Sequence, residues 1–270
     1  MSTTPRVATA PVRRCDVHRS IAWLTGAVGA GTLAVSVAAL ASPTLMRIMT
    51  RNLAQLRAGQ WWRIITPVLV QPDGWGQLVF NLLGVTVVGA ALEHRTSRAA
   101  WILTYLLGGV GGIAAASAWQ PADLGGGSSD AVAALIGALT LLLAAENHDH
   151  HDRNDPGGSR PWAAWPAQVY CVFFAGYLTA LDLGGVWWSI LAGDATIAAF
   201  FIARRALTPT GVTRACLLLV GAAGVTMTAQ QDGHGLGIIA GAAIASLILL
   251  RRHALTARST RCHVPTSHIR

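Results

Sequence analysis

The feature that most constrains the fold is a succession of long apolar stretches with few or no charged residues. Eight of them approach or reach the roughly 17–25 residues that a membrane-spanning helix needs. They lie at about 20–41, 75–92, 99–119, 129–146, 163–181, 186–203, 214–231 and 234–250. Only 12% of the residues are charged, about half of the roughly 25% in a soluble domain. We therefore expect an all-α fold, a polytopic membrane helical bundle with about eight transmembrane helices.

The arginines between these stretches predict the orientation of the bundle. If the N-terminus lies in the cytoplasm, 16 arginines fall in cytoplasmic segments and 4 in outer segments. Because cytoplasmic loops of membrane proteins carry the excess of positive charge, both termini are predicted inside. The same placement argues against nucleic acid as the partner, although the formal net charge is +8.

Only the ends and one loop lie outside the predicted spans at any length. Residues 1–19 and 251–270 are expected to be basic cytoplasmic tails, 20–250 the membrane domain, and 43–73 an outer loop. The first apolar stretch has 22 residues, which is longer than the roughly 7–15 of a signal peptide. We expect this helix to be retained, although Ala39-Leu40-Ala41 resembles a cleavage site.

Three polar residues occupy equivalent places at the outer ends of predicted helices. Asn81, Ser129 and His234 each lie early in a helix that the topology directs inward. Polar groups in a membrane are costly, so they mark either function or contacts between helices. A shared depth near the outer face favours one common site.

The helices that begin at Ser129 and His234 also carry small residues at four-residue spacing, which lets helix backbones approach closely. These rows are Ser129, Ala133 and Gly137 on one helix, and Gly237, Gly241 and Ala245 on the other. If the rows face each other, Ser129 Oγ and His234 come within hydrogen-bond reach. That pair is the minimum for a serine nucleophile with a general base.

With these motifs the chain resembles the rhomboid intramembrane serine proteases. The family's outer-loop Trp-Arg pair falls on Trp62-Arg63, and its His-x-x-x-Asn motif falls on Gln77 and Asn81. The other matching motifs are Tyr105 to Gly112, Gly127-Ser128-Ser129-Asp130 with Gly137, and His234 with Gly237 and Gly241. Gln77 stands where the family has His, and Asp130 stands where it has Gly. The resemblance covers roughly 57–145 and 232–252.

The resemblance implies a rhomboid-like core and a Ser-His dyad that hydrolyses peptide bonds in or near transmembrane segments of other membrane proteins. Ser129 and His234 would be catalytic, and Asn81 and Gln77 would stabilise the oxyanion. Gly127, Gly137, Gly237 and Gly241 would serve helix packing, and Trp62 and Arg63 the outer loop. The resemblance implies no cofactor, no metal and no carboxylate behind His234. The expected setting is a bacterial inner or plasma membrane, with the lipid bilayer and transmembrane protein substrates as partners.

The sequence leaves several alternatives open. Another alignment puts Ile190, with Gly193 after it, at the position of the family's His, which would make the protein a catalytically inactive relative that binds transmembrane segments. Ser128 competes with Ser129 as the nucleophile, although the eight-residue spacing to Gly137 favours Ser129. Asp194 lies in the middle of a span, which leaves a small transporter as a more distant hypothesis. The metal-capable residues of 146–152 are expected to form a solvated loop.

Overall fold

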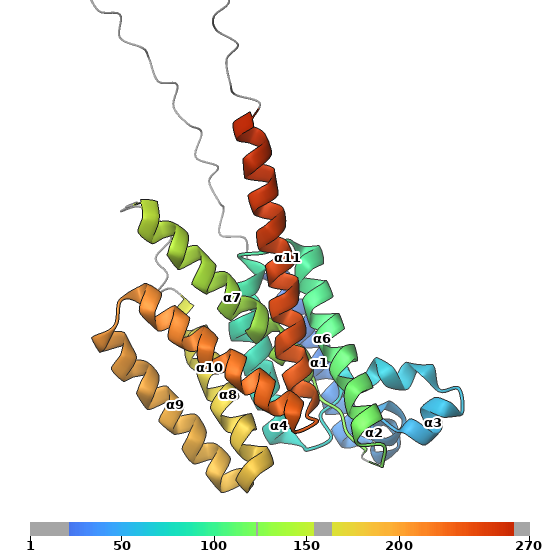
Figure 1. Ribbon diagram of the computed structural model, residues 1–270. Coiled ribbons are helices and arrows are strands. Elements are labelled where there is room, and N and C mark those ends of the chain that lie inside the picture. The colour runs from blue at the N-terminus through green and yellow to red at the C-terminus, as the bar shows by residue number, and fades with distance from the viewer. Residues whose placement is uncertain (1–21, 123, 154–163, 262–270) are drawn as a thin grey trace, which may run out of the picture.

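The computed structural model describes residues 22–122, 124–153 and 164–261, and this part of the chain contains helices and no strand. The helices form one bundle, with a group of short helices at one end (Figure 1). The long helices are α1 (Trp23–Ala41), α4 (Trp75–Gly84) with η3 (Val85–Gly89) and α5 (Ala90–Glu93), α6 (Arg98–Trp119), α7 (Ser129–Arg153), α8 (Trp165–Gly184), α9 (Val186–Ala206), α10 (Pro209–Ala229) and α11 (Gly233–Arg261). The short ones are α2 (Pro43–Met49), α3 (Leu53–Arg57), η1 (Trp61–Ile64) and η2 (Thr66–Leu69).

Seven helices of the described part are long and apolar enough to cross a membrane, so the protein is a multi-pass membrane protein with an all-α fold. The predicted span that does not meet this measure is 163–181, which falls on α8. This helix has 20 residues, but it is rich in aromatic residues and contains Gln168. Much of α8 is buried against other helices rather than exposed, including Tyr170, Cys171 and Phe174.

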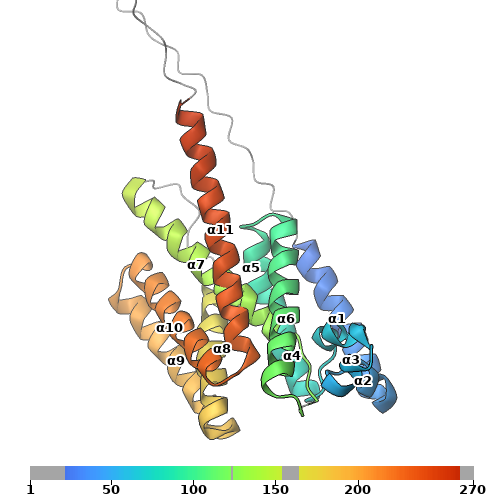
Figure 2. The same ribbon diagram turned by 45° about the vertical axis from the view of Figure 1, so that its right-hand side comes forward.

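Two helices continue beyond the ends expected from the sequence. Helix α7 reaches Arg153, so the backbone of the predicted loop at 146–152 is helical. Helix α11 reaches Arg261, so the first part of the predicted tail at 251–270 is helical as well. The predicted tail at 1–19 lies outside the described residues. The beginning of α1 and the end of α11 lie towards the same side of the bundle, opposite α2 and α3 (Figure 2).

Helix α7 forms the centre of the bundle, where it packs against α6, α10 and α11. The side chains from Ala131 to Ile136 are fully buried. Glycines bring α11 against α7 at backbone distance, since a Cβ on Gly241 would collide with the carbonyl of Ala134. In the same way, a Cβ on Gly137 would collide with the carbonyl of Ile238.

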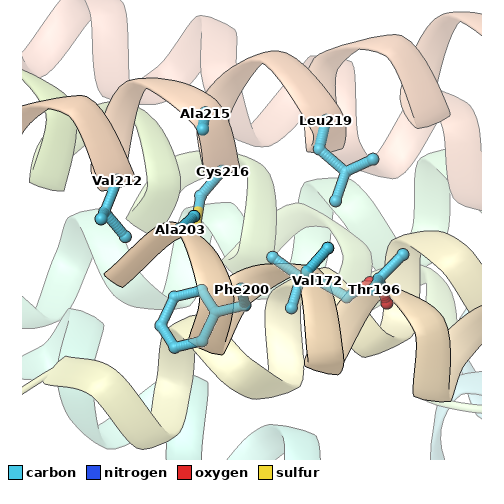
Figure 3. Close-up of a pocket in the computed structure, with 9 residues that line it drawn as sticks. Val172, Thr196, Phe200, Ala203, Val212, Ala215, Cys216 and Leu219 are labelled. Carbon is cyan, nitrogen blue, oxygen red and sulfur yellow. The ribbon is translucent and has the colours of Figure 1, made fainter. Parts of the chain in front are cut away.

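Helices α8, α9 and α10 lie together on one side of the bundle (Figure 1). A small, partly open apolar pocket of about 150 Å³ lies between them. Figure 3 shows Val172 of α8, Phe200 of α9 and Cys216 of α10 around it. Cys171 and Cys216 are buried free thiols. This part of the molecule supports the bundle by apolar packing and contributes Phe174, whose ring lies edge-on to His234.

We expect Gly241→Ala to lower the free energy of unfolding by about 1–3 kcal/mol, because the added methyl group forces α11 away from α7. Titration with a denaturing detergent in mixed micelles measures the change. Gly111→Ala on α6 is the matched control, since a Cβ there has no neighbour within 4 Å. The control is expected to be neutral or stabilising by up to about 1 kcal/mol. Equal stability of the two variants would contradict the close approach of α7 and α11.

Candidate functional site

A polar cavity of about 220 Å³ opens where α7 and α11 begin. The arginine count predicts that this end of the bundle faces outward. Ser129, Asp130, Asp232 and His234 line the cavity together with Gln77. Arg51, Asp73 and Gln120 complete its polar lining. Such a lining gives water a place at the end of an otherwise apolar bundle.

The segment before Ser129 is held by the loop at 43–73. The backbone N–H of Gly127 donates to the Pro67 carbonyl at 2.8 Å, and the N–H of Arg51 donates to the Gly125 carbonyl at 2.8 Å. Gly127 has a φ of +137°, and a Cβ there would approach Gln77 Nε2 at 2.7 Å. Only glycine adopts this conformation readily. The turn places Ser129 as the first residue of α7, half-buried at the cavity.

The two neighbouring serines face different surroundings. Ser128 is fully buried, and its Oγ accepts a hydrogen bond from Gln71 Nε2 at 3.2 Å. Gln71 Oε1 accepts in turn from Asn81 Nδ2 at 2.7 Å. Neither Ser128 nor Asn81 belongs to the cavity lining, whereas Ser129 does. The predicted residue Asn81 therefore lies behind the cavity, in a buried hydrogen-bonded chain that runs from Asn81 through Gln71 to Ser128.

Gln77, the residue at the place of the family's His, does reach the cavity from the first turn of α4. Its side-chain amide donates to the Gly126 carbonyl at 3.0 Å. Its carbonyl oxygen accepts from the backbone N–H of Asp73 at 3.1 Å. Gln77 thus carries an N–H group next to the segment that leads into Ser129.

His234 has a carboxylate on either side of its ring. Asp232 Oδ1 lies 2.6 Å from Nδ1 and also accepts the backbone N–H of His234 at 3.0 Å. Asp130 Oδ1 lies 3.8 Å from Nε2. The expectation of no carboxylate behind His234 is therefore wrong. The sequence signal for this carboxylate is Asp232, which comes two residues before His234 and directly before the helix. Asp at this position commonly caps the first N–H groups of a helix.

Glycines also shape the space around Asp130. A Cβ on Gly112 of α6 would collide with the carboxylate carbon of Asp130. A Cβ on Gly233 would lie 3.1 Å from Asp130 Oδ1, and one on Gly237 would lie 2.6 Å from the Asp130 carbonyl. The predicted packing residues Gly137, Gly237 and Gly241 all lie between α7 and α11, whereas Gly127 shapes the turn before Ser129. Gly112 and Gly233 leave room for the carboxylate of Asp130, and Gly237 leaves room for its backbone carbonyl.

The sequence pair Trp62-Arg63 lies in η1, but its two side chains differ in exposure. Trp62 is 47% exposed, whereas Arg63 is buried. The Arg63 guanidinium donates to the carbonyls of Arg47 and Thr50 at 2.8 Å each, and to Gln60 Oε1 at 2.7 Å. Arg63 therefore joins α2 to η1 and holds the loop that supports Gly125 and Gly127.

The remaining candidates lie elsewhere. Asp194 is exposed on α9 and does not line the polar cavity. Ile190 of α9 does not line it either, and α9 packs on α8 and α10. The side chains of His148, Asp149, His150, His151 and Asp152 lie outside the described residues. The geometry thus gathers Ser129, Gln77 and His234 at one cavity and leaves Ile190 and Asp194 outside it.

Comparison with known proteins identifies the class of membrane protein. Residues 58–186 match the family model of the Rhomboid domain, and this match supports a rhomboid family protein. Rhomboid protease GluP of Bacillus subtilis (strain 168) is 32% identical over 104 residues, which are 38% of this chain and 20% of that protein. The putative rhomboid protease YdcA of the same organism is 31% identical over 90 residues, which are 33% of this chain and 45% of that protein. The matched stretch thus covers less than half the length of either relative.

The matched domain ends at residue 186, before Ile190 and His234, the two residues that compete for the place of the family's His. The match therefore leaves the choice between Ile190 and His234 to the geometry. Helix α11 packs directly on α7 through Gly237 and Gly241. His234 lines the same cavity as Ser129. Both observations favour α11 as the partner of the serine helix.

We expect Arg63→Lys to loosen the loop at 43–73, because a single ammonium group cannot reproduce the guanidinium fork. Loss of about 1.5 kcal/mol of hydrogen bonding corresponds to roughly tenfold faster amide exchange in the loop. Hydrogen exchange followed by mass spectrometry measures this change. Arg57→Lys is the control, since Arg57 is exposed in α3. Equal exchange in both variants would show that Arg63 does not hold the loop.

Proposed function

We propose that this protein is an intramembrane serine protease that hydrolyses peptide bonds in or near transmembrane segments of other membrane proteins. The observation that carries the proposal is the shared cavity of Ser129 and His234 at the beginning of α7 and α11. The buried environment of Ser128 supports Ser129 as the nucleophile. The bacterial relatives support a cell membrane of a bacterium as its location.

In this proposal His234 Nε2 takes the proton of Ser129 while Ser129 Oγ attacks the scissile carbonyl carbon. The tetrahedral intermediate collapses when the C–N bond breaks, and His234 gives the proton to the leaving amine. A water molecule then attacks the acyl-enzyme and transfers a proton to His234. Release of the acid returns that proton to Ser129. The polar cavity supplies the space for this water.

Asp232 is a positioning residue in this mechanism. With the proton of the neutral imidazole on Nδ1, the ring donates to Asp232 Oδ1 at 2.6 Å and keeps the lone pair on Nε2. The carboxylate also stabilises the imidazolium that forms when Ser129 is deprotonated. The proposal thus extends the expected Ser-His dyad by an Asp that holds the base.

The oxyanion contact is assigned to the Gln77 amide and the backbone N–H of Ser129. The first N–H groups of a helix have no partner within the helix and carry partial positive charge. Gln77 Nε2 exchanges its bond with the Gly126 carbonyl for one with the oxyanion. Asn81 enters the proposal as a support, because its amide donates to Gln71, which binds Ser128.

A second candidate is a non-catalytic protein that binds transmembrane segments. Asp130 favours it, since its carboxylate lies 3.8 Å from Nε2 of His234. A negative charge there competes with Ser129 for the ring and opposes an oxyanion nearby. The two candidates differ in whether Ser129 reacts.

Covalent labelling by a fluorophosphonate probe separates the two candidates. We expect the purified full chain in detergent to be labelled, Ser129→Ala to lose labelling, and Ser128→Ala to keep it. In-gel fluorescence measures the labelling, and the unfolding transition shows that each variant is folded. Loss of labelling in Ser128→Ala but not in Ser129→Ala would reassign the nucleophile. A folded wild-type protein that is never labelled would favour the non-catalytic candidate.

We expect Asp232→Asn to lower kcat for a transmembrane peptide by about 10²–10⁴-fold with little change in KM, because the variant no longer fixes the ring or stabilises the imidazolium. Asp73→Asn is the matched control, since Asp73 lines the same cavity but lies exposed on its rim. Steady-state cleavage kinetics measure both variants. A rise in KM at constant kcat would place Asp232 in substrate binding instead.

A further inference from the structure

Helix α9 carries an acidic side chain far from either of its ends. Asp194 lies within a helix of 21 residues that is long and apolar enough to cross a membrane. By the helical rise, Asp194 is about 10 Å along the axis from Trp187 and about 16 Å from Arg205. Trp and Arg near the ends of a span are typical of the two membrane surfaces. Asp194 is therefore expected at the depth of the lipid hydrocarbon chains.

The side chain of Asp194 lies on the outside of the bundle. Helix α9 forms the edge of the bundle (Figure 1), where it packs on α8 and α10. Ser189, Gly193 and Phe200 make up its buried side, whereas Asp194 is exposed. Within the part of the chain that the structure describes, Asp194 has no hydrogen bond and no ion pair. Since ionisable groups in a membrane are almost always paired or line a water-filled cavity, this carboxylate points to a partner.

Other exposed residues of α9 continue this side of the helix at the spacing of a helix–helix contact. They follow one another at intervals of four or three residues and are Trp187, Leu191, Asp194, Ala198, Phe201 and Arg205. A repeat that averages about 3.5 residues forms the seam along which two helices pack. Ala198, one turn further along α9 than Asp194, is small enough to let a second backbone approach closely. This stripe, named here the α9 face, thus has the pattern of a contact surface for one more helix.

The charge of Asp194 determines which kind of helix fits the α9 face. A second copy of this chain, related by a two-fold axis along the membrane normal, would place Asp194 opposite Asp194. Two like charges repel strongly at this depth, because the surroundings have a low dielectric constant. A helix with Lys or Arg at the same depth gains instead, since both charged groups exchange lipid for each other. Charge complementarity therefore favours a different membrane protein.

We propose that the α9 face binds a transmembrane helix of another membrane protein, and that this helix carries a Lys or Arg opposite Asp194. The basic residue of the partner lies about 10 Å from the membrane surface that Trp187 marks. Ala198 receives the backbone of the partner one turn further into the membrane. The residues of the α9 face do not line the polar cavity of Ser129, so this binding does not depend on the proposed protease activity.

Transmembrane peptides in lipid vesicles test the α9 face. The full chain, labelled with a donor fluorophore, is reconstituted with an acceptor-labelled peptide of about 20 leucine and alanine residues. One peptide carries a single Lys at the depth of Asp194, and its matched peptide carries Leu there. We expect the Lys peptide to bind at least about fivefold more tightly than the Leu peptide, as measured by energy transfer at increasing peptide density. Asp194→Leu is expected to abolish this preference.

Two further variants separate the charge from the contact between helices. Ala198→Phe keeps the carboxylate but adds bulk to the α9 face, so we expect it to weaken binding of the Lys peptide. Ala222→Phe, at an exposed position of α10, is the matched control and is expected to bind as the parent does. The unfolding transition shows that each variant is folded.

Three results would overturn the proposal. The first is equal binding of the Lys and Leu peptides to the parent chain. The second is a preference for Lys that persists in Asp194→Leu. The third is energy transfer between donor-labelled and acceptor-labelled copies of the chain that disappears in Asp194→Leu and does not change with the Lys peptide, because it would assign the α9 face to a second copy.

Discussion

The close approach of α11 to α7 is the contact on which the site depends. Gly237 and Gly241 place the backbone of α11 against the carbonyls of Asp130 and Ala134. On the facing helix α7, Gly137 leaves room for the carbonyl of Ile238 of α11. Without a hydrophobic driving force between helices in lipid, such van der Waals contact between small residues is what joins them. Because both helices begin at the same end of the bundle, the contact also brings their first residues to one cavity. A wider separation would leave Ser129 and His234 on separate surfaces.

The loop at 43–73 decides which way the start of α7 faces. Arg63 binds the loop together, and the loop binds the segment before Ser129 through Gly125 and Gly127. The amide chain from Asn81 through Gln71 then holds Ser128 in the interior. Here the network leaves Ser129 as the serine that faces the cavity.

The two carboxylates beside His234 have opposite consequences for chemistry at this cavity. Asp232 lies at Nδ1, where a negative charge orients the ring and leaves Nε2 available. Asp130 lies on the Nε2 side, where a negative charge competes with a serine for the ring. Asp130 stands where the rhomboid motif that this chain resembles has Gly, so the second contact is a departure from that pattern.

The sequence predicts the membrane class, the all-α fold and the resemblance to the rhomboid family, because apolar length and motif order do not depend on distant contacts. It also indicated that the helices of Ser129 and His234 meet, through the spacing of their small residues. Helix packing and the conformation of the outer loop place Asn81 behind the cavity, bury Arg63 and put Asp232 behind His234. These outcomes depend on side-chain direction at helix ends and in an irregular loop, where neither the 3.6-residue period nor hydropathy restricts the geometry. The extra length of α7 and α11 escaped prediction for a related reason, since polar residues continue a helix once tertiary packing has formed it.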